Sequence, residues 1–135
     1  MLRLAASAHA AIVGHAYDGL PDEACGLLLG DPVRGVVPRF HPTANAARSS
    51  RVYSIGPRDY LDADDAAAEA GLAIVGVVHS HTHTDAYPSP TDVEQAPDPD
   101  WHYVIVSLRD EAPVLRSYRI VDGTITEEPV AVDRG

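Results

Sequence analysis

The chain has 135 residues, 45% of them hydrophobic, which suits one compact domain over residues 1–135 with a sizeable core. Its net charge of -10 argues against binding to nucleic acid or to an anionic membrane surface. A single cysteine, Cys25, excludes an intrachain disulfide and any metal site that needs two cysteines. No stretch has the length of a transmembrane helix, and polar residues interrupt the N-terminal apolar segment too early for a signal peptide, so we expect a cytoplasmic protein.

Hydrophobic periodicity and turn-forming residues predict alternating helices and strands along the chain. In chain order these are a helix over 3–18, strands over 23–29, 33–40 and 51–55, a helix over 57–70, a strand over 73–80, a short helix from Pro90, and strands over 102–108, 114–121 and 124–130. Residues 41–50 and 81–88 are predicted loops. We expect the first two strands to pair as a hairpin, and Asp122-Gly123 is typical of a second hairpin. This order predicts an α/β (α+β) fold with a mixed sheet.

Two histidines give the strongest chemical signal in the chain. His79 and His81 end the almost purely apolar segment 73–78, which indicates a buried strand. Because side chains alternate along a strand, both imidazoles point to the same face. Two nitrogens held on one face by a rigid strand suit a zinc ion.

A carboxylate follows at a position that could complete the site. Ser89 is a typical helix N-cap and Pro90 a typical first helical residue, so Asp92 is expected in the first turn of a short helix. As a third ligand, Asp92 would leave one tetrahedral position open for water, which is the pattern of catalytic rather than structural zinc.

Hydrolysis also needs groups that do not bind the metal. Glu23, at the start of an apolar strand, is a candidate general acid/base for the attacking water. Ser89 is a candidate donor to the oxyanion, although it also has a purely structural role as an N-cap. Glu23, taken alone, could equally be a surface carboxylate.

These residues resemble the motif of the JAMM (MPN+) metalloprotease family, E…H-x-H-x7-S-x2-D, with every position filled at the required spacing. The resemblance extends over essentially the whole chain and is strongest to small bacterial members of the Mec type, through segments such as 21–26, 86–89 and 115–123. It implies a single JAMM/MPN core, a curved mixed sheet flanked by helices and similar to cytidine deaminases. It further implies His79, His81 and Asp92 as Zn²⁺ ligands, Glu23 as general acid/base and Ser89 as a donor to the tetrahedral intermediate.

The resemblance also implies a substrate. Mec-type members release cysteine from the C-terminal Gly-Gly tail of a small ubiquitin-like sulfur-carrier protein, in cysteine biosynthesis. The alternative is a non-catalytic MPN-type interaction module, but such members usually lack the ligands. A nucleobase deaminase is excluded because it needs a Pro-Cys-x-x-Cys segment. The released residue, the carrier and the oligomeric state, with a homodimer among the options, stay open.

Overall fold

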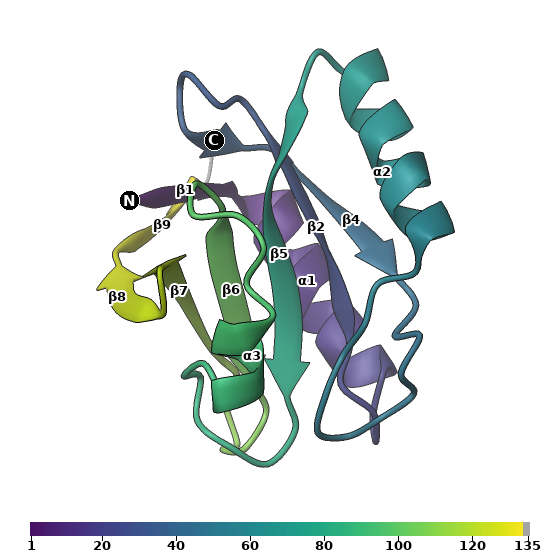
Figure 1. Cartoon of the computed structure of the whole chain (residues 1–135), viewed down its shortest axis with the longest axis vertical. Coiled ribbons are helices and arrows are strands. Elements are labelled where there is room, and N and C mark those ends of the chain that lie inside the picture. Colours follow the sequence, from purple (N-terminus) through teal and green to yellow (C-terminus); the bar gives the residue numbers. More distant parts are fainter. Residues whose placement is uncertain (134–135) are drawn as a thin grey trace.

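The computed structural model describes residues 1–133, and within them the strands and helices alternate much as the sequence predicts (Figure 1). The strands are β1 (Leu2–Ala5), β2 (Cys25–Gly30), β3 (Val36–Val37), β4 (Arg39–Thr43), β5 (Ala73–His81), β6 (His102–Ser107), β7 (Val114–Val121), β8 (Thr124–Glu128) and β9 (Val130–Asp133). The helices are α1 (Ala6–Asp18), α2 (Pro57–Glu69) and α3 (Pro90–Glu94).

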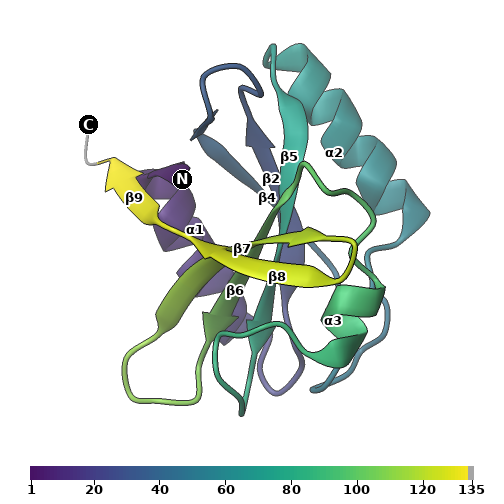
Figure 2. The same ribbon diagram turned by 60° about the vertical axis from the view of Figure 1, so that its left-hand side comes forward.

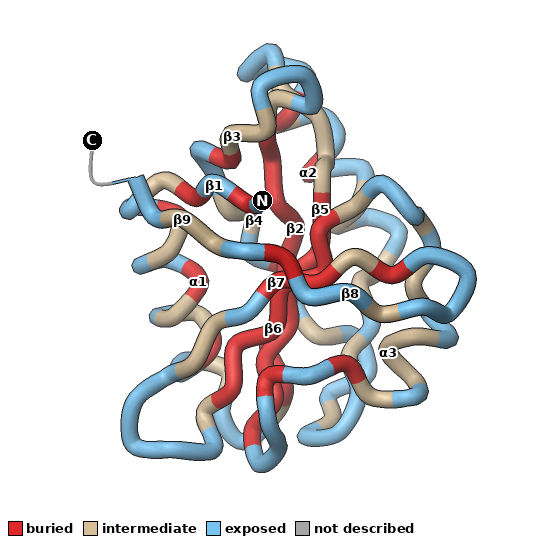
Figure 3. The backbone as a smooth tube through the Cα atoms, turned by 90° about the vertical axis from the view of Figure 1, so that its left-hand side faces the viewer, coloured by how far each residue is buried: buried red, intermediate tan, exposed pale blue. Residues whose placement is uncertain are grey.

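Six strands form the main sheet in the order β4-β2-β5-β6-β7-β8. β5 and β6 run parallel, and the other neighbouring pairs are antiparallel, so the predicted mixed sheet is confirmed. The hairpin predicted at Asp122-Gly123 is present as the pair β7–β8. The other predicted hairpin is confirmed in part, because β2 pairs with β4, which shares only residues 39–40 with the predicted strand over 33–40. β2, β5 and β6 form the most buried part of the sheet (Figure 3).

Helices α1 and α2 cover opposite faces of this sheet. Leu28 and Val78 pack with residues of α1, whereas their chain neighbours Leu27 and Val77 pack with Ala63 of α2. Because both faces of β5 are covered, its sequence is apolar without alternation. By the same alternation, His79 and His81 lie on the face that contains Val77, which is the face that α2 covers.

The N-terminal prediction was partly wrong, because residues 2–5 form strand β1 and the helix begins only at Ala6. Leu2 and Leu4 are fully buried while Arg3 between them is exposed, which is the period of a strand. β1 pairs in parallel with β3 and β9, forming a second sheet that the sequence analysis did not predict.

Two predicted strands are interrupted at prolines. The strand predicted over 33–40 is a turn followed by β3 and β4, with Pro38 between them. The strand predicted over 124–130 ends at Glu128, and after Pro129 the chain enters the second sheet as β9 (Figure 2). Proline has no backbone N–H for a ladder, which explains both breaks.

The loop after β4 also differs from the prediction. Residues 41–43 belong to β4, and residues 51–55 do not form the predicted strand. Their backbone is held instead by side chains: Ser49 Oγ accepts from the N–H groups of Arg51 and Val52. Local hydroxyl bonds of this kind compete with strand pairing.

Among the described residues, no helix has the length and apolar character needed to cross a membrane.

Candidate metal centre

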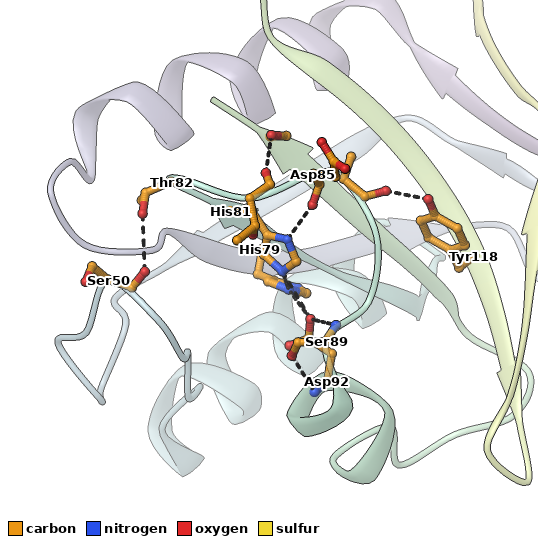
Figure 4. A network of polar contacts seen from close by, with 11 residues as sticks. Ser50, His79, His81, Thr82, Asp85, Ser89, Asp92 and Tyr118 are labelled. Atoms are coloured by element: carbon orange, nitrogen blue, oxygen red, sulfur yellow. Dashed lines mark hydrogen bonds and ion pairs between the residues drawn. The ribbon is translucent and has the colours of Figure 1, made fainter. Parts of the chain in front are cut away.

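Strand β5 places His79 and His81 on one face of the main sheet, as predicted. His79 lies between Cys25 of β2 and Ile105 of β6, so the strand that carries it is held from both sides. Both imidazoles are 4% exposed. Their Nε2 atoms lie 3.1 Å apart and point to the same spot (Figure 4).

Helix α3 brings Asp92 to the same spot through a capping box. Ser89 is the N-cap, with its Oγ accepting from the backbone N–H of Asp92 at 3.1 Å. In return, the backbone N–H of Ser89 donates to Asp92 Oδ2 at 2.8 Å. This reciprocal pair fixes the carboxylate in the first turn of the helix, where the sequence predicted it.

The three candidate ligand atoms form an almost equilateral triangle. His79 Nε2, His81 Nε2 and Asp92 Oδ2 are each 3.1 Å from the other two. Ligands of tetrahedral zinc at 2.0–2.1 Å from the ion are about 3.3 Å apart, so the three atoms fit such an ion closely. Among the described residues, His79, His81 and Asp92 form a group of side chains that could hold a metal ion.

The protonation states of His79 and Asp92 suit a cation. Burial lowers the pKa of His79, which favours the neutral imidazole that a metal requires. Burial alone would raise the pKa of Asp92, but hydrogen bonds from His79 and His81 hold it far below its ordinary value, so the carboxylate is ionised. For His81, burial opposes protonation, but its bonds to Asp92 and Asp85 outweigh burial and raise the pKa.

Two further contacts orient the imidazoles. His81 Nδ1 donates to the backbone oxygen of Asp85 at 2.7 Å, which fixes the tautomer that leaves Nε2 free for a ligand bond (Figure 4). The ring of Tyr53 stacks on His79, with centroids 4.4 Å apart and planes 18° apart. Neither contact was predictable from the sequence, because a backbone acceptor has no sequence signal and Tyr53 lies in a segment predicted to be a strand.

Glu23 lies beside this triangle. The β2–β5 pairing has Cys25 opposite His79, and continuing the same register for two residues puts Glu23 opposite His81. Its side chain is 5% exposed, and its Oε1 has no hydrogen-bond partner among the described residues. Burial raises the pKa of Glu23 to about 7; His81 lowers it by a smaller amount, and the charge of Asp92 adds to the rise. A carboxyl group with a pKa near 7 is suited to accept and release a proton at neutral pH.

A cleft of about 510 Å³ joins Glu23 to the metal triangle. It is lined by Glu23, Ser50, Arg51, His81, Thr82, His83, Thr84 and Ser89. Because Ser89 Oγ uses an acceptor site for its cap, its hydroxyl proton is still available to a ligand in the cleft. The structure therefore brings all five sequence-predicted residues to one place: the triad as one group, and Glu23 and Ser89 as linings of the adjoining cleft.

Comparison with known proteins agrees with this arrangement. The family model described as "Prokaryotic homologs of the JAB domain" matches residues 5–121. The chain is 49% identical over 123 residues to a CysO-cysteine peptidase of Mycobacterium tuberculosis, covering 90% of this chain and 84% of that protein.

Solved structures show the same fold. Protein DSY2949 of Desulfitobacterium hafniense has a TM-score of 0.92 and 33% identity, with 100% of this chain and 94% of that chain covered. AF2198 of Archaeoglobus fulgidus, a JAB1/MPN domain protein, has a TM-score of 0.64 and 20% identity, with 96% and 97% covered.

Fold, triad and relatives together define a peptidase of the JAMM class. More particularly, the chain belongs to the family of prokaryotic homologues of the JAB domain.

Proposed function

We propose that this protein is a zinc-dependent peptidase that cuts the amide after the C-terminal glycine of a small ubiquitin-like sulfur-carrier protein and releases cysteine. The observation that carries the proposal is the triangle of the buried His79 and His81 with the partly buried Asp92, and the buried Glu23 carboxyl group beside it. The 49% identity to a mycobacterial CysO-cysteine peptidase supports the choice of substrate.

Zinc is the favoured metal because two imidazoles, one carboxylate and an open fourth position form its common catalytic ligand set. When bound there, zinc would supply a Lewis acid for the scissile carbonyl and lower the pKa of the attacking water. Asp92 and the two imidazoles would hold the ion, and the capping box and the Asp85 carbonyl would keep these ligands oriented.

Glu23 does the proton transfer in this scheme. Its carboxylate takes a proton from the attacking water, and the resulting acid gives that proton to the leaving amine nitrogen. The raised pKa of Glu23, about 7, lets the same group do both at neutral pH. Ser89 stabilises the negative charge that develops on the carbonyl oxygen, by donating its hydroxyl proton.

The carrier tail would reach this centre in an extended conformation through the cleft, making backbone hydrogen bonds as an added strand does. The non-catalytic interaction module is the weaker alternative, because a scaffold gives no reason to bury Glu23 without a partner next to three convergent ligand atoms. A cytoplasmic location and the extent of one domain over residues 1–135 stay predictions, and the oligomeric state, including a homodimer, stays open.

Mass spectrometry of a ubiquitin-like carrier ending in Gly-Gly-Cys tests the proposal. The zinc-loaded protein should shorten the carrier by one cysteine, and a chelator should stop the reaction. Glu23→Gln should keep zinc but lose at least about a hundredfold in rate, since general acid–base catalysis contributes that much or more. His79→Ala should lose both zinc and activity.

The matched control is Glu111→Gln, the same substitution at an exposed residue that belongs neither to the metal triangle nor to the lining of the cleft, which should leave the rate unchanged. Full activity of Glu23→Gln, or an intact carrier after incubation with the zinc-loaded wild type, would refute the proposal.

A further inference from the structure

The cleft beside Glu23 contains a positive charge that the proposed mechanism does not use. Of the described residues that line it, Arg51 alone carries a permanent positive charge. We propose that Arg51 binds the α-carboxylate of the released residue, so that the enzyme prefers a substrate with one residue and a free C-terminus beyond the scissile amide. This inference rests on the proposed function and adds the specificity that a sulfur-carrier adduct would need.

Arg51 has no internal ion-pair partner among residues 1–133. The ion pairs of that part of the chain engage other arginines, namely Arg34, Arg58, Arg109, Arg116 and Arg119. Arg51 is exposed, and its guanidinium group makes none of the hydrogen bonds found within the described residues. In a protein of net charge -10, an arginine without a carboxylate partner is available for an anionic ligand.

The backbone around Arg51 is tied to the site. The backbone oxygen of Ser49 accepts from the N–H of Glu23 at 2.8 Å, and Thr82, next to His81, donates its hydroxyl to the oxygen of Ser50 at 3.2 Å (Figure 4). Ser49 Oγ in turn accepts from the N–H of Arg51 at 3.0 Å. The backbone at Arg51 is therefore held in place relative to both the general base and the metal triangle.

Asn45 strengthens this connection. Its side-chain N–H groups donate to the backbone oxygens of Glu23 at 2.9 Å and Val52 at 3.0 Å. The side-chain amide of Asn45 thus connects the backbone of Glu23 to the backbone of Val52, the residue that follows Arg51. Such a set of bonds on a segment without regular structure is characteristic of a loop that holds a functional side chain in place.

The chemistry of the reaction favours a positive charge at this place. In a C-terminal residue, the carboxyl carbon is two bonds from the scissile nitrogen, so its negative charge enters the cleft together with the leaving group. Glu23 must come close to that nitrogen to protonate it, and before it accepts a proton its carboxylate repels an incoming anion. Arg51, on the loop bonded to Glu23, offsets that repulsion, and its planar guanidinium group can bind a carboxylate through two parallel hydrogen bonds.

A comparison of two carriers tests this inference. One ends in Gly-Gly-Cys with a free acid, and the other ends in the same sequence as the C-terminal amide. Wild-type enzyme should cleave the acid with a kcat/KM at least about tenfold higher, the size expected for a charge-assisted hydrogen bond. Arg51→Ala should lower kcat/KM for the acid to the level of the amide and leave the amide unchanged, whereas Arg51→Lys should restore part of the preference.

The charge-matched control is Arg39→Ala, which removes an exposed arginine of β4 that has no ion pair among the described residues and does not line the cleft. It should keep the preference for the acid. Equilibrium binding of both carriers to Glu23→Gln gives a second readout, in which Arg51→Ala should weaken binding of the acid only.

The outcomes separate the two proposals. Equal cleavage of acid and amide by the wild type overturns the role of Arg51 and leaves the proposed function standing. An equal loss on both carriers in Arg51→Ala also overturns it, because the arginine would then contact the carrier body or support the fold. If the wild type cleaves neither carrier when loaded with zinc, the proposed function itself fails.

Discussion

Replacing Glu23 by glutamine should make the metal-free protein more stable at alkaline pH, although it slows hydrolysis by the zinc-loaded protein. The reason is that Glu23 is 5% exposed, and its Oε1 lacks a hydrogen-bond partner among the described residues. Burial therefore penalises the charged form and raises the pKa from 4.5 to about 7. A neutral amide of the same shape does not carry that penalty.

The size of the effect follows from the pKa. Between pH 4.5 and 7, the folded state binds a proton at Glu23 that the unfolded state has already released, so stability falls as the pH rises. One pKa unit corresponds to about 1.4 kcal/mol, and the shift from 4.5 to about 7 therefore costs roughly 3 kcal/mol at pH 8. For a chain of this length, that difference corresponds to about 10 °C in melting temperature.

Thermal unfolding in the presence of a chelator measures this effect. Glu23→Gln should melt about 10 °C above the wild type at pH 8, and the difference should vanish near pH 4, where both forms are neutral. Glu111→Gln should match the wild type at both pH values. A lower melting temperature for Glu23→Gln at pH 8, or a difference that does not change with pH, would refute the assignment of Glu23 as a buried carboxyl group without a partner.

Three other changes test separate parts of the structure. Burial alone would raise the pKa of Glu128, but hydrogen bonds from His102 and Ser117 lower it to about 2, so Glu128→Gln should cost roughly 2–3 kcal/mol at pH 7 in urea unfolding. That cost should fall as the pH drops from about 4.5 towards 2, and a cost independent of pH would contradict it. Ser89→Ala removes the cap of α3 and should cost about 1 kcal/mol in the same assay, in addition to lowering kcat; unchanged stability would argue against the capping box. Tyr53→Phe keeps the ring stacked on His79 and should retain zinc affinity, whereas Tyr53→Ala should weaken zinc binding measured by competition with a chelator, and equal affinities would show that the stacking is irrelevant.

The metal triangle was predictable because two short-range rules define it. Strand periodicity puts His79 and His81 on one face, and the Ser89 capping box fixes the direction of Asp92. Neither rule requires knowledge of distant contacts. Glu23 is different, since its place opposite His81 depends on the β2–β5 register. In the sequence, its position at the start of an apolar strand made it only a candidate, and the family motif added the assigned role.

The error at the N-terminus has a physical cause that the local sequence does not show, which is pairing between residues far apart in the chain. Strand β1 was included in the first helix because its partners, β3 and β9, lie at 36–37 and 130–133. The break at Pro129 did have a local signal, because a proline without a backbone N–H argues against a continuous strand. The hydrogen bonds of Asn45 and the stacking of Tyr53 have no such signal, since they depend on where the loop folds back onto β5.

Metal analysis of the purified protein tests the central claim most directly. After incubation with zinc and removal of the excess, the wild type should retain about one zinc per chain, as expected for a three-ligand site, while Asp92→Ala and His79→Ala retain none. Circular dichroism should show that both variants are folded. Retention of the same zinc by a folded Asp92→Ala and a folded His79→Ala, or no retained zinc in the wild type, would contradict the account.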